Sequence, residues 1–216
     1  MIKAVLWDFG GVITSSPFEA FNRYEADNNI PKDFIRSVNA TNPDRNAWAQ
    51  FESNAVSLAE FDPIFAEETA AAGHRIAGAE VMKLLSGSIR EEMVAALVLI
   101  KQKYRIACIT NNVKGAGAGP GMASDSVKAA RVSEVMALFD FVIESSVVGL
   151  RKPNPKIYQL ACEKMGIEPT EAVFLDDLGI NLKPAKAMGM RTIKVTSAAQ
   201  ALTELSEILA MELAAK

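Results

Sequence analysis

The stretch AVFLDDLGINLKPAKAMGMRTIKV, at residues 172–195, places one helical pattern between two short apolar runs. We expect a strand at 172–175, a helix at 180–188 and a second strand at 192–195. A strand, a helix and a strand in this order favour two parallel strands joined by a crossover helix. The pair Asp176 and Asp177 directly follows the first of these strands.

The same alternation of short apolar strands and helices recurs upstream of this unit. Expected strands lie at 3–7, 105–110 and 139–144, and expected helices lie at 91–103, 125–137, 156–165 and from about residue 198. This alternation specifies a parallel sheet whose two faces are covered by helices. The fold class is therefore expected to be α/β, with a doubly wound, Rossmann-like parallel sheet as its core.

The segment between the first strand and residue 85 shows no strand pattern. Phe18, Phe21 and Tyr24 recur at helical spacing. Ser57 followed by Glu60 has the spacing of a capping box, in which the hydroxyl accepts from an early helix amide and the carboxylate reaches back. This segment is therefore expected to be entirely helical.

Chain length limits the number of domains. A chain of 216 residues, of which 50% are hydrophobic, can bury one large core and a smaller appendage. We expect residues 1–15 and 86–216 to form the α/β core, and residues 16–85 to form a small all-helical domain inserted after the first strand.

Charge and cysteine content exclude several classes of partner. The formal charge is −3, from 23 basic and 26 acidic residues, and the basic residues are scattered, so nucleic acid is not expected as a partner. Cys108 and Cys162 lie in apolar patterns, which predicts buried free thiols and a reducing, cytoplasmic location. The longest apolar helical run, 93–100, is too short to span a bilayer, so no membrane association is expected.

The residues that end the strands suggest a shared site. In a doubly wound sheet, ligands bind outside the carboxyl ends of the strands. The polar residues expected there are Asp8, Thr110 with Asn111, Lys152, and Asp176 with Asp177, followed by Asn181. An aspartate can attack a phosphoryl group if Mg²⁺ and a lysine offset the repulsion between anions, and carboxylates are suitable Mg²⁺ ligands. Thr110 is suited to holding phosphoryl oxygens, and the turn at Gly10 and Gly11 would let a main-chain carbonyl reach the metal.

Each of these groups also has an ordinary structural interpretation. An aspartate after a strand often serves a turn, and Lys152 before a proline could be a solvated loop cation. Asp176 and Asp177 could cap the following helix. We favour the shared site, because four separate strand ends would otherwise each carry a suitable group by chance.

Four motifs resemble those of the haloacid dehalogenase-like superfamily, over nearly the whole chain. They are WDFGGVIT at 7–14, CITNN at 108–112, Lys152 in VGLRKPNPKIY at 148–158, and FLDDLGIN at 174–181. The stretches FDFVIES, GLRKPNPKIYQLAC and VFLDDLGINLKPAKAMGM more narrowly resemble the N-terminal phosphatase domain of soluble epoxide hydrolases. The resemblance does not extend to the separate domain that hydrolyses epoxides, so that activity is not implied.

The resemblance implies a mechanism. Asp8 would be the nucleophile that forms an aspartyl-phosphate, while Thr110 and Lys152 hold the transferring group. The Mg²⁺ ligands would be Asp8, the carbonyl of Gly10 and Asp177. Behind them, Asp176 would orient ligands or water, Asn181 would support Asp176, and Asn111 would orient the surroundings of the nucleophile. The segment 16–85 would be the cap that closes over the site and selects a small phosphorylated substrate.

One residue departs from the superfamily pattern. Two positions after the nucleophile, phosphatases of this kind usually carry a second aspartate that protonates the leaving group, whereas this chain has Gly10. General acid–base catalysis contributes roughly 10²- to 10⁴-fold in rate, so we expect slow turnover of alkyl phosphates. Aryl or acyl phosphates, whose leaving groups depart without protonation, would remain suitable. Thr14, Ser15, Ser16 or a cap side chain could substitute, and the sequence singles out none of them.

Two alternatives therefore stay open beside a Mg²⁺-dependent phosphatase. The first is a metal-free 2-haloacid dehalogenase, in which Asp8 attacks carbon and no second aspartate is needed. The pair Asp176 and Asp177 argues against it, because acidic metal ligands would only add repulsion around the nucleophile. The second is a catalytically quiet protein that binds a phosphorylated ligand or a partner, and it is motivated by Gly10 alone. The sequence does not indicate an oligomeric state.

Overall fold

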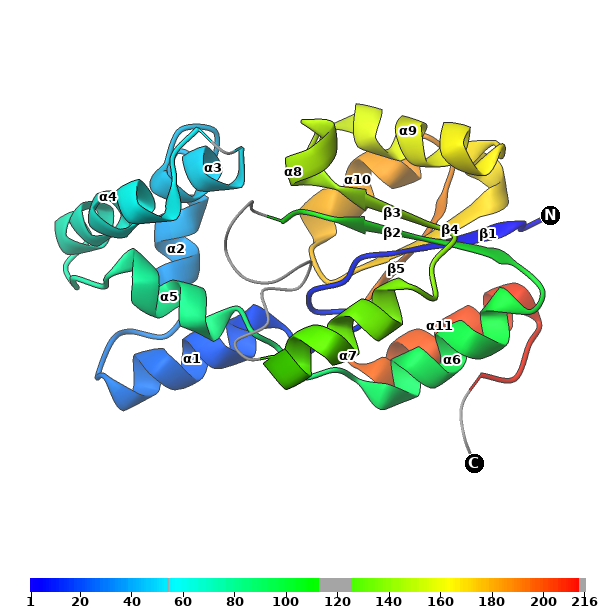
Figure 1. Cartoon of the computed structure of the whole chain (residues 1–216), viewed down its shortest axis with the longest axis horizontal. Coiled ribbons are helices and arrows are strands. Elements are labelled where there is room, and N and C mark those ends of the chain that lie inside the picture. Colours follow the sequence, from blue (N-terminus) through cyan, green and yellow to red (C-terminus); the bar gives the residue numbers. More distant parts are fainter. Residues whose placement is uncertain (54, 113–125, 214–216) are drawn as a thin grey trace.

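The structure, a computed structural model, describes residues 1–53, 55–112 and 126–213. Its centre is a parallel sheet of five strands in the order β3-β2-β1-β4-β5 (Figure 1). The strands are β1 (Ala4–Trp7), β2 (Arg105–Thr110), β3 (Phe141–Glu144), β4 (Ala172–Asp176) and β5 (Arg191–Lys194). The order confirms the predicted doubly wound α/β fold, because the chain winds outward from β1 to β3 and then returns to β4 on the other side of β1.

Strand β1 lies at the centre of the sheet, and all four of its residues are buried. Val5 pairs with Ile106 of β2 and with Val173 of β4, so β1 has a partner strand on each side. A strand covered on both faces favours apolar residues at every position, which explains the unbroken run AVLW. The residue that follows β1 therefore lies where the strand order reverses, which is the usual ligand crevice of such a sheet.

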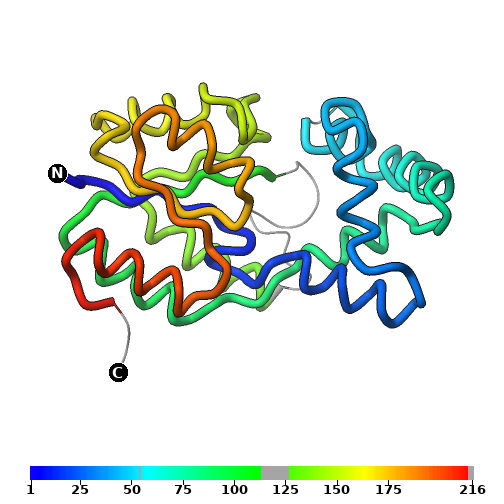
Figure 2. Tube along the Cα trace, turned by 180° about the vertical axis from the view of Figure 1, so that it is seen from behind, coloured from blue at the N-terminus to red at the C-terminus, as the bar shows by residue number. Residues whose placement is uncertain are grey.

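Helices cover both faces of the sheet (Figures 1 and 2). One face is covered by α6 (Glu91–Lys101), α7 (Ser126–Met136) and α11 (Ala198–Leu209), and the other by α8 (Ser145–Val148), α9 (Pro155–Met165) and α10 (Gly179–Ala187). A 3₁₀ turn at Pro169–Glu171 precedes β4. Val5 and Trp7 belong to the apolar cluster on the first face, and Ala4 and Leu6 to the cluster on the second. The alternation of side chains along β1 thus contributes to two cores.

A block of five helices follows β1 and lies beyond the carboxyl ends of the strands (Figures 1 and 2). The helices are α1 (Pro17–Asp27), α2 (Phe34–Ala40), α3 (Ala47–Glu52), α4 (Leu58–Ala71) and α5 (Gly78–Leu84). The predicted capping box at the start of α4 is confirmed, with Ser57 and Glu60 bonded reciprocally.

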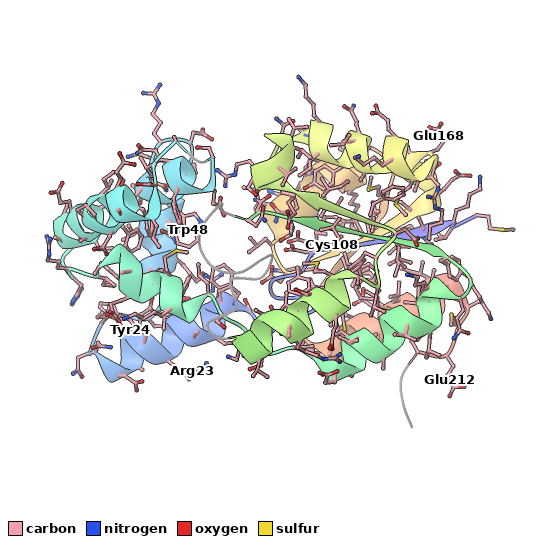
Figure 3. The ribbon with its side chains drawn as sticks, viewed as in Figure 1. Arg23, Tyr24, Trp48, Cys108, Glu168 and Glu212 are labelled. Atoms are coloured by element: carbon pink, nitrogen blue, oxygen red, sulfur yellow. The ribbon has the colours of Figure 1, made fainter. Side chains whose placement is uncertain are left out.

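The helical block has an apolar cluster of its own, which includes Phe51, Phe61 and Phe65. Trp48 lies within this block (Figure 3) and packs edge-on against Phe61, with ring centroids 5.8 Å apart. A separate cluster is what a separately folding unit would need. The division into domains at residues 15/16 and 85/86 stays a prediction.

Several predicted boundaries need correction. The strand expected from residue 139 begins at Phe141, because the amides of Leu138 and Phe139 still bond three residues back in the last turn of the preceding helix. The helix expected to reach residue 103 ends at Lys101, because the amides of Gln102 and Lys103 bond three residues back instead of four. The strand expected to end at residue 175 includes Asp176, which is in register with a residue of β5. Residue 125, predicted to start a helix, lies outside the described residues.

The predictions from composition can be compared with the structure at two points. Cys108 and Cys162 are buried free thiols, as expected. Within the described part of the chain, no helix is both long and apolar enough to cross a bilayer.

Candidate active site

Asp8 is the first residue after β1, and hydrogen bonds fix the direction of its side chain. Its amide donates to the carbonyl of Leu175 at 2.8 Å, which extends the pairing of β1 with β4. Its Oδ1 accepts from the amide of Phe9 at 2.7 Å. Among the described residues no hydrogen bond reaches Oδ2 of Asp8. One oxygen therefore holds the carboxylate in place, and the other is left for chemistry.

The two glycines of the following loop have different requirements. Gly11 has a φ of +75°, and a Cβ at this position would lie 2.2 Å from Oδ2 of Asp177. Both the left-handed backbone and the close approach exclude a side chain at Gly11. A Cβ at Gly10 would meet no atom of the described residues within 4 Å, and the backbone there is not left-handed. Of the two glycines in the predicted turn, Gly11 is therefore the one whose backbone requires glycine.

Lys152 is buried, with 1% of its side chain exposed, and it lies between two carboxylates. Its Nζ is 2.7 Å from Oδ1 of Asp8 and 2.8 Å from Oδ2 of Asp176. Burial opposes the positive charge, but Asp176 and Asp8 outweigh this and raise the pKa of Lys152 above its usual range. The alternative that Lys152 is a solvated loop cation is wrong. Lys152 instead supplies a buried, charged ammonium group that contacts Asp8 beyond the carboxyl end of β1.

Asp176 is fully buried, and both of its oxygens already have hydrogen-bond donors. Oδ1 accepts from the amide of Leu178 at 2.8 Å, and Oδ2 accepts from Lys152. The side-chain amide of Asn181 donates to both oxygens at 3.1 Å. The hydroxyl of Tyr158 in turn donates to the carbonyl of Asn181 at 2.7 Å. A carboxylate so well satisfied is suited to holding Lys152 rather than to binding a ligand directly.

Asn111 holds the backbone of Lys152. Its side-chain Nδ2 donates to the carbonyl of Lys152 at 3.1 Å, and its Oδ1 accepts from the Lys152 amide at 2.9 Å. This two-point contact joins the end of β2 to a segment 41 residues away in sequence. Asn111 thus holds the backbone of Lys152, and Lys152 contacts Asp8. The predicted role of Asn111, to orient the surroundings of Asp8, stays a prediction.

Thr110 is the last residue of β2 and is buried. Its hydroxyl has no hydrogen bond with the described residues, which leaves it available to a ligand. The next two positions are occupied by amide side chains, and Asn112 accepts from the hydroxyl of Ser146 at 2.8 Å. Ser145 bonds the backbone of Asn112 in both directions. These contacts, which the sequence did not indicate, tie the end of β2 to the start of α8.

Three carboxylates gather at this edge of the sheet. Asp8, Asp176 and Asp177 each offer an oxygen atom, and these atoms lie within 4.8 Å of one another. Burial raises the pKa of Asp8 well above its ordinary value; Asp176 and Asp177 raise it further, while Lys152 lowers it. Such a cluster is costly without a cation, and hard carboxylate oxygens are the donors that Mg²⁺ prefers. The residues present therefore fit a divalent cation. The part predicted for the Gly10 carbonyl stays a prediction.

Comparison with protein families decides what kind of protein this is. The family model of haloacid dehalogenase-like hydrolases matches residues 2–189. The chain belongs to this family. The resemblance drawn from the four sequence motifs is thereby confirmed, and the α/β core with its acidic cluster is that of a haloacid dehalogenase-like hydrolase.

Relatives of this haloacid dehalogenase-like hydrolase include an epoxide hydrolase. Bifunctional epoxide hydrolase 2 of Mus musculus is 32% identical over 220 residues, which cover 96% of this chain and 39% of the relative. The chain spans about two fifths of the length of the epoxide hydrolases that it matches.

Solved structures share the fold. A haloacid dehalogenase family enzyme from Bacteroides thetaiotaomicron, in complex with magnesium and inorganic phosphate, has a TM-score of 0.60 at 21% identity and covers 95% of this chain and 99% of its own. L-2-haloacid dehalogenase from Xanthobacter autotrophicus, with chloropropionic acid covalently bound, has a TM-score of 0.61 at 18% identity, covering 100% and 85%. The same overall fold therefore occurs in an enzyme that binds magnesium and phosphate and in a dehalogenase, so the site residues must distinguish the two kinds of chemistry.

Two further contacts of the site were not predicted. The hydroxyl of Ser16 donates to Oδ2 of Asp177 at 3.0 Å. The guanidinium of Arg90 donates to the carbonyl of Gly11 at 3.0 Å and lies 3.6 Å from Glu19 of α1. Ser16 was one of several hydroxyls considered near the first motif, whereas no sequence pattern pointed to Arg90. Both contacts join residues far apart in the chain, so neither leaves a local pattern.

Replacing Asp177 with asparagine should stabilise the metal-free protein at neutral pH. Burial and then Asp176 raise the pKa of Asp177 from 3.8 to about 6, while the Ser16 hydroxyl lowers it in part. Because the folded-state pKa exceeds the unfolded-state value, this carboxyl favours folding below pH 3.8 and loses that contribution as the pH rises through about 6. At pH 7.5 the neutral variant should gain about 1–3 kcal/mol, or a few degrees in melting temperature.

Calorimetry in the presence of a chelator, at pH 4.5 and pH 7.5, checks this prediction. The stabilisation should shrink at pH 4.5, where the folded wild type carries the proton. Asparagine can still accept from Ser16, so the comparison isolates the charge. A variant that melts at or below the wild-type temperature at pH 7.5 would show that Asp177 is not repelled by its neighbours.

Proposed function

We propose that this chain is a Mg²⁺-dependent phosphatase that hydrolyses small phosphoric monoesters through an aspartyl-phosphate on Asp8. The observation that carries the proposal is the contact of the Lys152 ammonium with both Asp8 and Asp176 at the edge of the sheet. A nucleophilic carboxylate can approach an anionic phosphoryl group only where fixed positive charge offsets their repulsion. Lys152 supplies one such charge.

A metal ion would supply the remainder. Asp8, the carbonyl of Gly10 and Asp177 would hold Mg²⁺, with Asp176 orienting the groups behind them. Mg²⁺, when bound, neutralises charge on the transferring group and its carboxylate ligands. Support comes from the fit of the acidic cluster and from the family enzyme of similar fold that binds magnesium and inorganic phosphate.

The chain's own residues account for the steps. Oδ2 of Asp8, the oxygen without a hydrogen bond among the described residues, attacks phosphorus while the bond to the leaving oxygen breaks. Lys152 and the hydroxyl of Thr110 hold the phosphoryl oxygens during the transfer. Water then attacks the phosphorus of the aspartyl-phosphate, which releases inorganic phosphate and restores the carboxylate of Asp8.

The leaving group must depart without help at position 10. Gly10 can neither donate nor accept a proton through a side chain, so the leaving oxygen has to be stable as an anion or take its proton from water. Phosphates of phenols or of carboxylic acids meet this requirement, and simple alkyl phosphates do not. We therefore place aryl and acyl phosphates ahead of sugar or alcohol phosphates as substrates.

The helical block is proposed to act as the cap, with residues 16–85 forming the cap and residues 1–15 and 86–216 the catalytic core. Glu52 ends α3 and pairs with Arg151 at 2.5 Å. Arg151 directly precedes Lys152. Burial raises the pKa of Glu52, although Arg151 lowers it in part. A carboxylate at the carboxyl end of a helix is unfavourable, because it opposes the helix dipole. The ion pair with Arg151 offsets this cost and joins the helical block to the loop that carries Lys152.

Metal-free dehalogenation is less well supported. It would use Asp8 and tolerate Gly10, but it has no need of Asp177, whose charge only adds to the repulsion around the nucleophile. A quiet binding protein remains compatible with the fold. It explains the absence of a side chain at position 10, but it does not explain why Oδ2 of Asp8 makes no hydrogen bond to the described residues beside Lys152.

Hydrolysis of an aryl phosphate by pure protein tests the proposal. Turnover with millimolar Mg²⁺ should fall about tenfold or more when a chelator is in excess, because the acidic cluster without a cation would repel the substrate. Turnover should return when Mg²⁺ is restored. Release of halide from 2-haloacids is measured in parallel. Turnover that is indifferent to the chelator, or halide release without phosphatase activity, would reverse the ranking.

A further inference from the structure

Ser16 stands at the start of α1 but does not cap it. Serine before a helix normally accepts a hydrogen bond from an amide of the first turn, which is worth about 0.5–2 kcal/mol. Here the side chain of Ser16 makes no such bond to α1. Its hydroxyl instead donates to Oδ2 of Asp177, 161 residues away in sequence, at 3.0 Å. The local interaction that its position offers is left unused, and such exceptions concentrate at functional sites.

The two segments that connect the helical block to the sheet hold Ser16 in place. The amide of Ser15 donates to the carbonyl of Ser88 at 2.8 Å, and the amide of Ser88 donates to the hydroxyl of Ser15 at 3.0 Å. Thr14, which precedes Ser15, and Ile89, which follows Ser88, form an antiparallel bridge. Gly87 fits closely, because a Cβ there would lie 2.7 Å from the carbonyl oxygen of Ser15. The two residues that precede Ser16 are therefore both tied to the returning segment.

A bond from Ser16 restricts what the Asp177 carboxylate can do. The hydroxyl fixes Oδ2 on the side of the connecting segment, next to the close contact with Gly11. Rotation about the last side-chain bond is then limited, and Oδ1 keeps a defined direction. Groups that orient a metal ligand from behind typically contribute about 10- to 100-fold to metal affinity or activity.

We infer that Ser16 is a positioning residue for Asp177, and that through it the metal site depends on the connection to the helical block. The inference rests on the proposed function, because it takes Asp177 to be a metal ligand. The residue that directly follows Ser16 is Pro17, the first residue of α1. Displacement of α1 relative to the sheet would therefore pull on the hydroxyl that orients a ligand. Mg²⁺ should be held best when the helical block is in the position described.

Titration of Mg²⁺ into full-length protein by calorimetry tests the inference directly. Ser16→Ala should raise the dissociation constant for Mg²⁺ about 10-fold. Ser16→Thr keeps the hydroxyl and should restore most of the affinity. Ser37→Ala is the matched control: it removes an exposed hydroxyl of α2 that donates to the carbonyl of Asp33, not to the acidic cluster or to the connecting segments, and it should leave the affinity within about twofold of the wild type.

The outcomes separate the inference from the proposed function. If wild-type protein binds no Mg²⁺, the proposed function fails. If the wild type binds Mg²⁺ and Ser16→Ala binds it equally well, the inference fails and the proposed function stands. Equal losses in Ser16→Ala and Ser37→Ala would show that loss of any serine hydroxyl weakens the protein's Mg²⁺ binding, and would also overturn the inference. Aryl phosphatase activity of Ser16→Ala should recover at saturating Mg²⁺, as expected for a residue that acts through metal affinity.

Discussion

Asp8→Asn should abolish aryl phosphatase activity, with a loss of roughly 10⁴-fold or more, as is usual for removal of a nucleophile. An amide cannot form the acyl phosphate, whereas its oxygen can still accept from the amide of Phe9 and from Lys152. The fold should therefore survive the change. Initial rates at saturating Mg²⁺ and substrate, together with the melting temperature, check both statements.

A second substitution of the same kind controls for this result. Asp27→Asn changes an exposed aspartate that ends α1 and does not belong to the acidic cluster, and it should leave the rate unchanged. Asp8→Asn protein that keeps wild-type turnover would show that the phosphoryl group does not pass through Asp8. A rate lost together with the melting transition would instead point to misfolding, and circular dichroism distinguishes the two cases.

Gly10→Asp should raise turnover of an alkyl phosphate by about 10²-fold or more, because it restores a general acid beside the leaving oxygen. The structure accommodates the change, since a Cβ at Gly10 meets no atom within 4 Å in the part of the chain that the structure describes, and the backbone is not left-handed. Aryl phosphates, whose leaving groups need no proton, should gain far less. The ratio of the alkyl rate to the aryl rate is the quantity to measure.

Gly10→Asn is the matched control for this experiment, because it has the same shape and no proton to transfer. An equal gain in Gly10→Asn would attribute the effect to packing. No gain in Gly10→Asp would mean that another group already supplies the proton. Activity in Gly10→Asp where the wild type has none at all would favour the quiet binding protein over the phosphatase.

The part of the candidate site that lies at the ends of strands could be predicted from the sequence. Asp8 and Asp177 follow buried strands, and Thr110 and Asp176 end them, so the topology of a parallel sheet alone brings these residues to one edge. The burial of Lys152 was not predictable. Its loop looks the same whether the side chain is solvated or lies between two carboxylates, and only the path of the chain from α8 to α9 decides.

Other contacts were beyond sequence analysis for a physical reason. The bond of Ser16 to Asp177 joins residues 161 positions apart, and a serine before a helix predicts a helix cap instead. Gly10 and Gly11 are adjacent glycines, and the sequence does not distinguish them. Only Gly11 has a positive φ and lies so near Asp177 that a side chain would not fit. Local patterns report on local structure, and these distinctions are set by the assembled fold.

The separate apolar clusters of the sheet and the helical block give the protein two built-in optical reporters. The chain has 2 tryptophans: Trp7 is buried in the cluster on one face of the sheet, next to Asp8, and Trp48 packs in the cluster of the helical block. Each part of the molecule therefore carries one indole fluorophore. The emission of Trp7 follows the strand that precedes Asp8, and the emission of Trp48 follows the helices, so loosening of either part can be observed without a label.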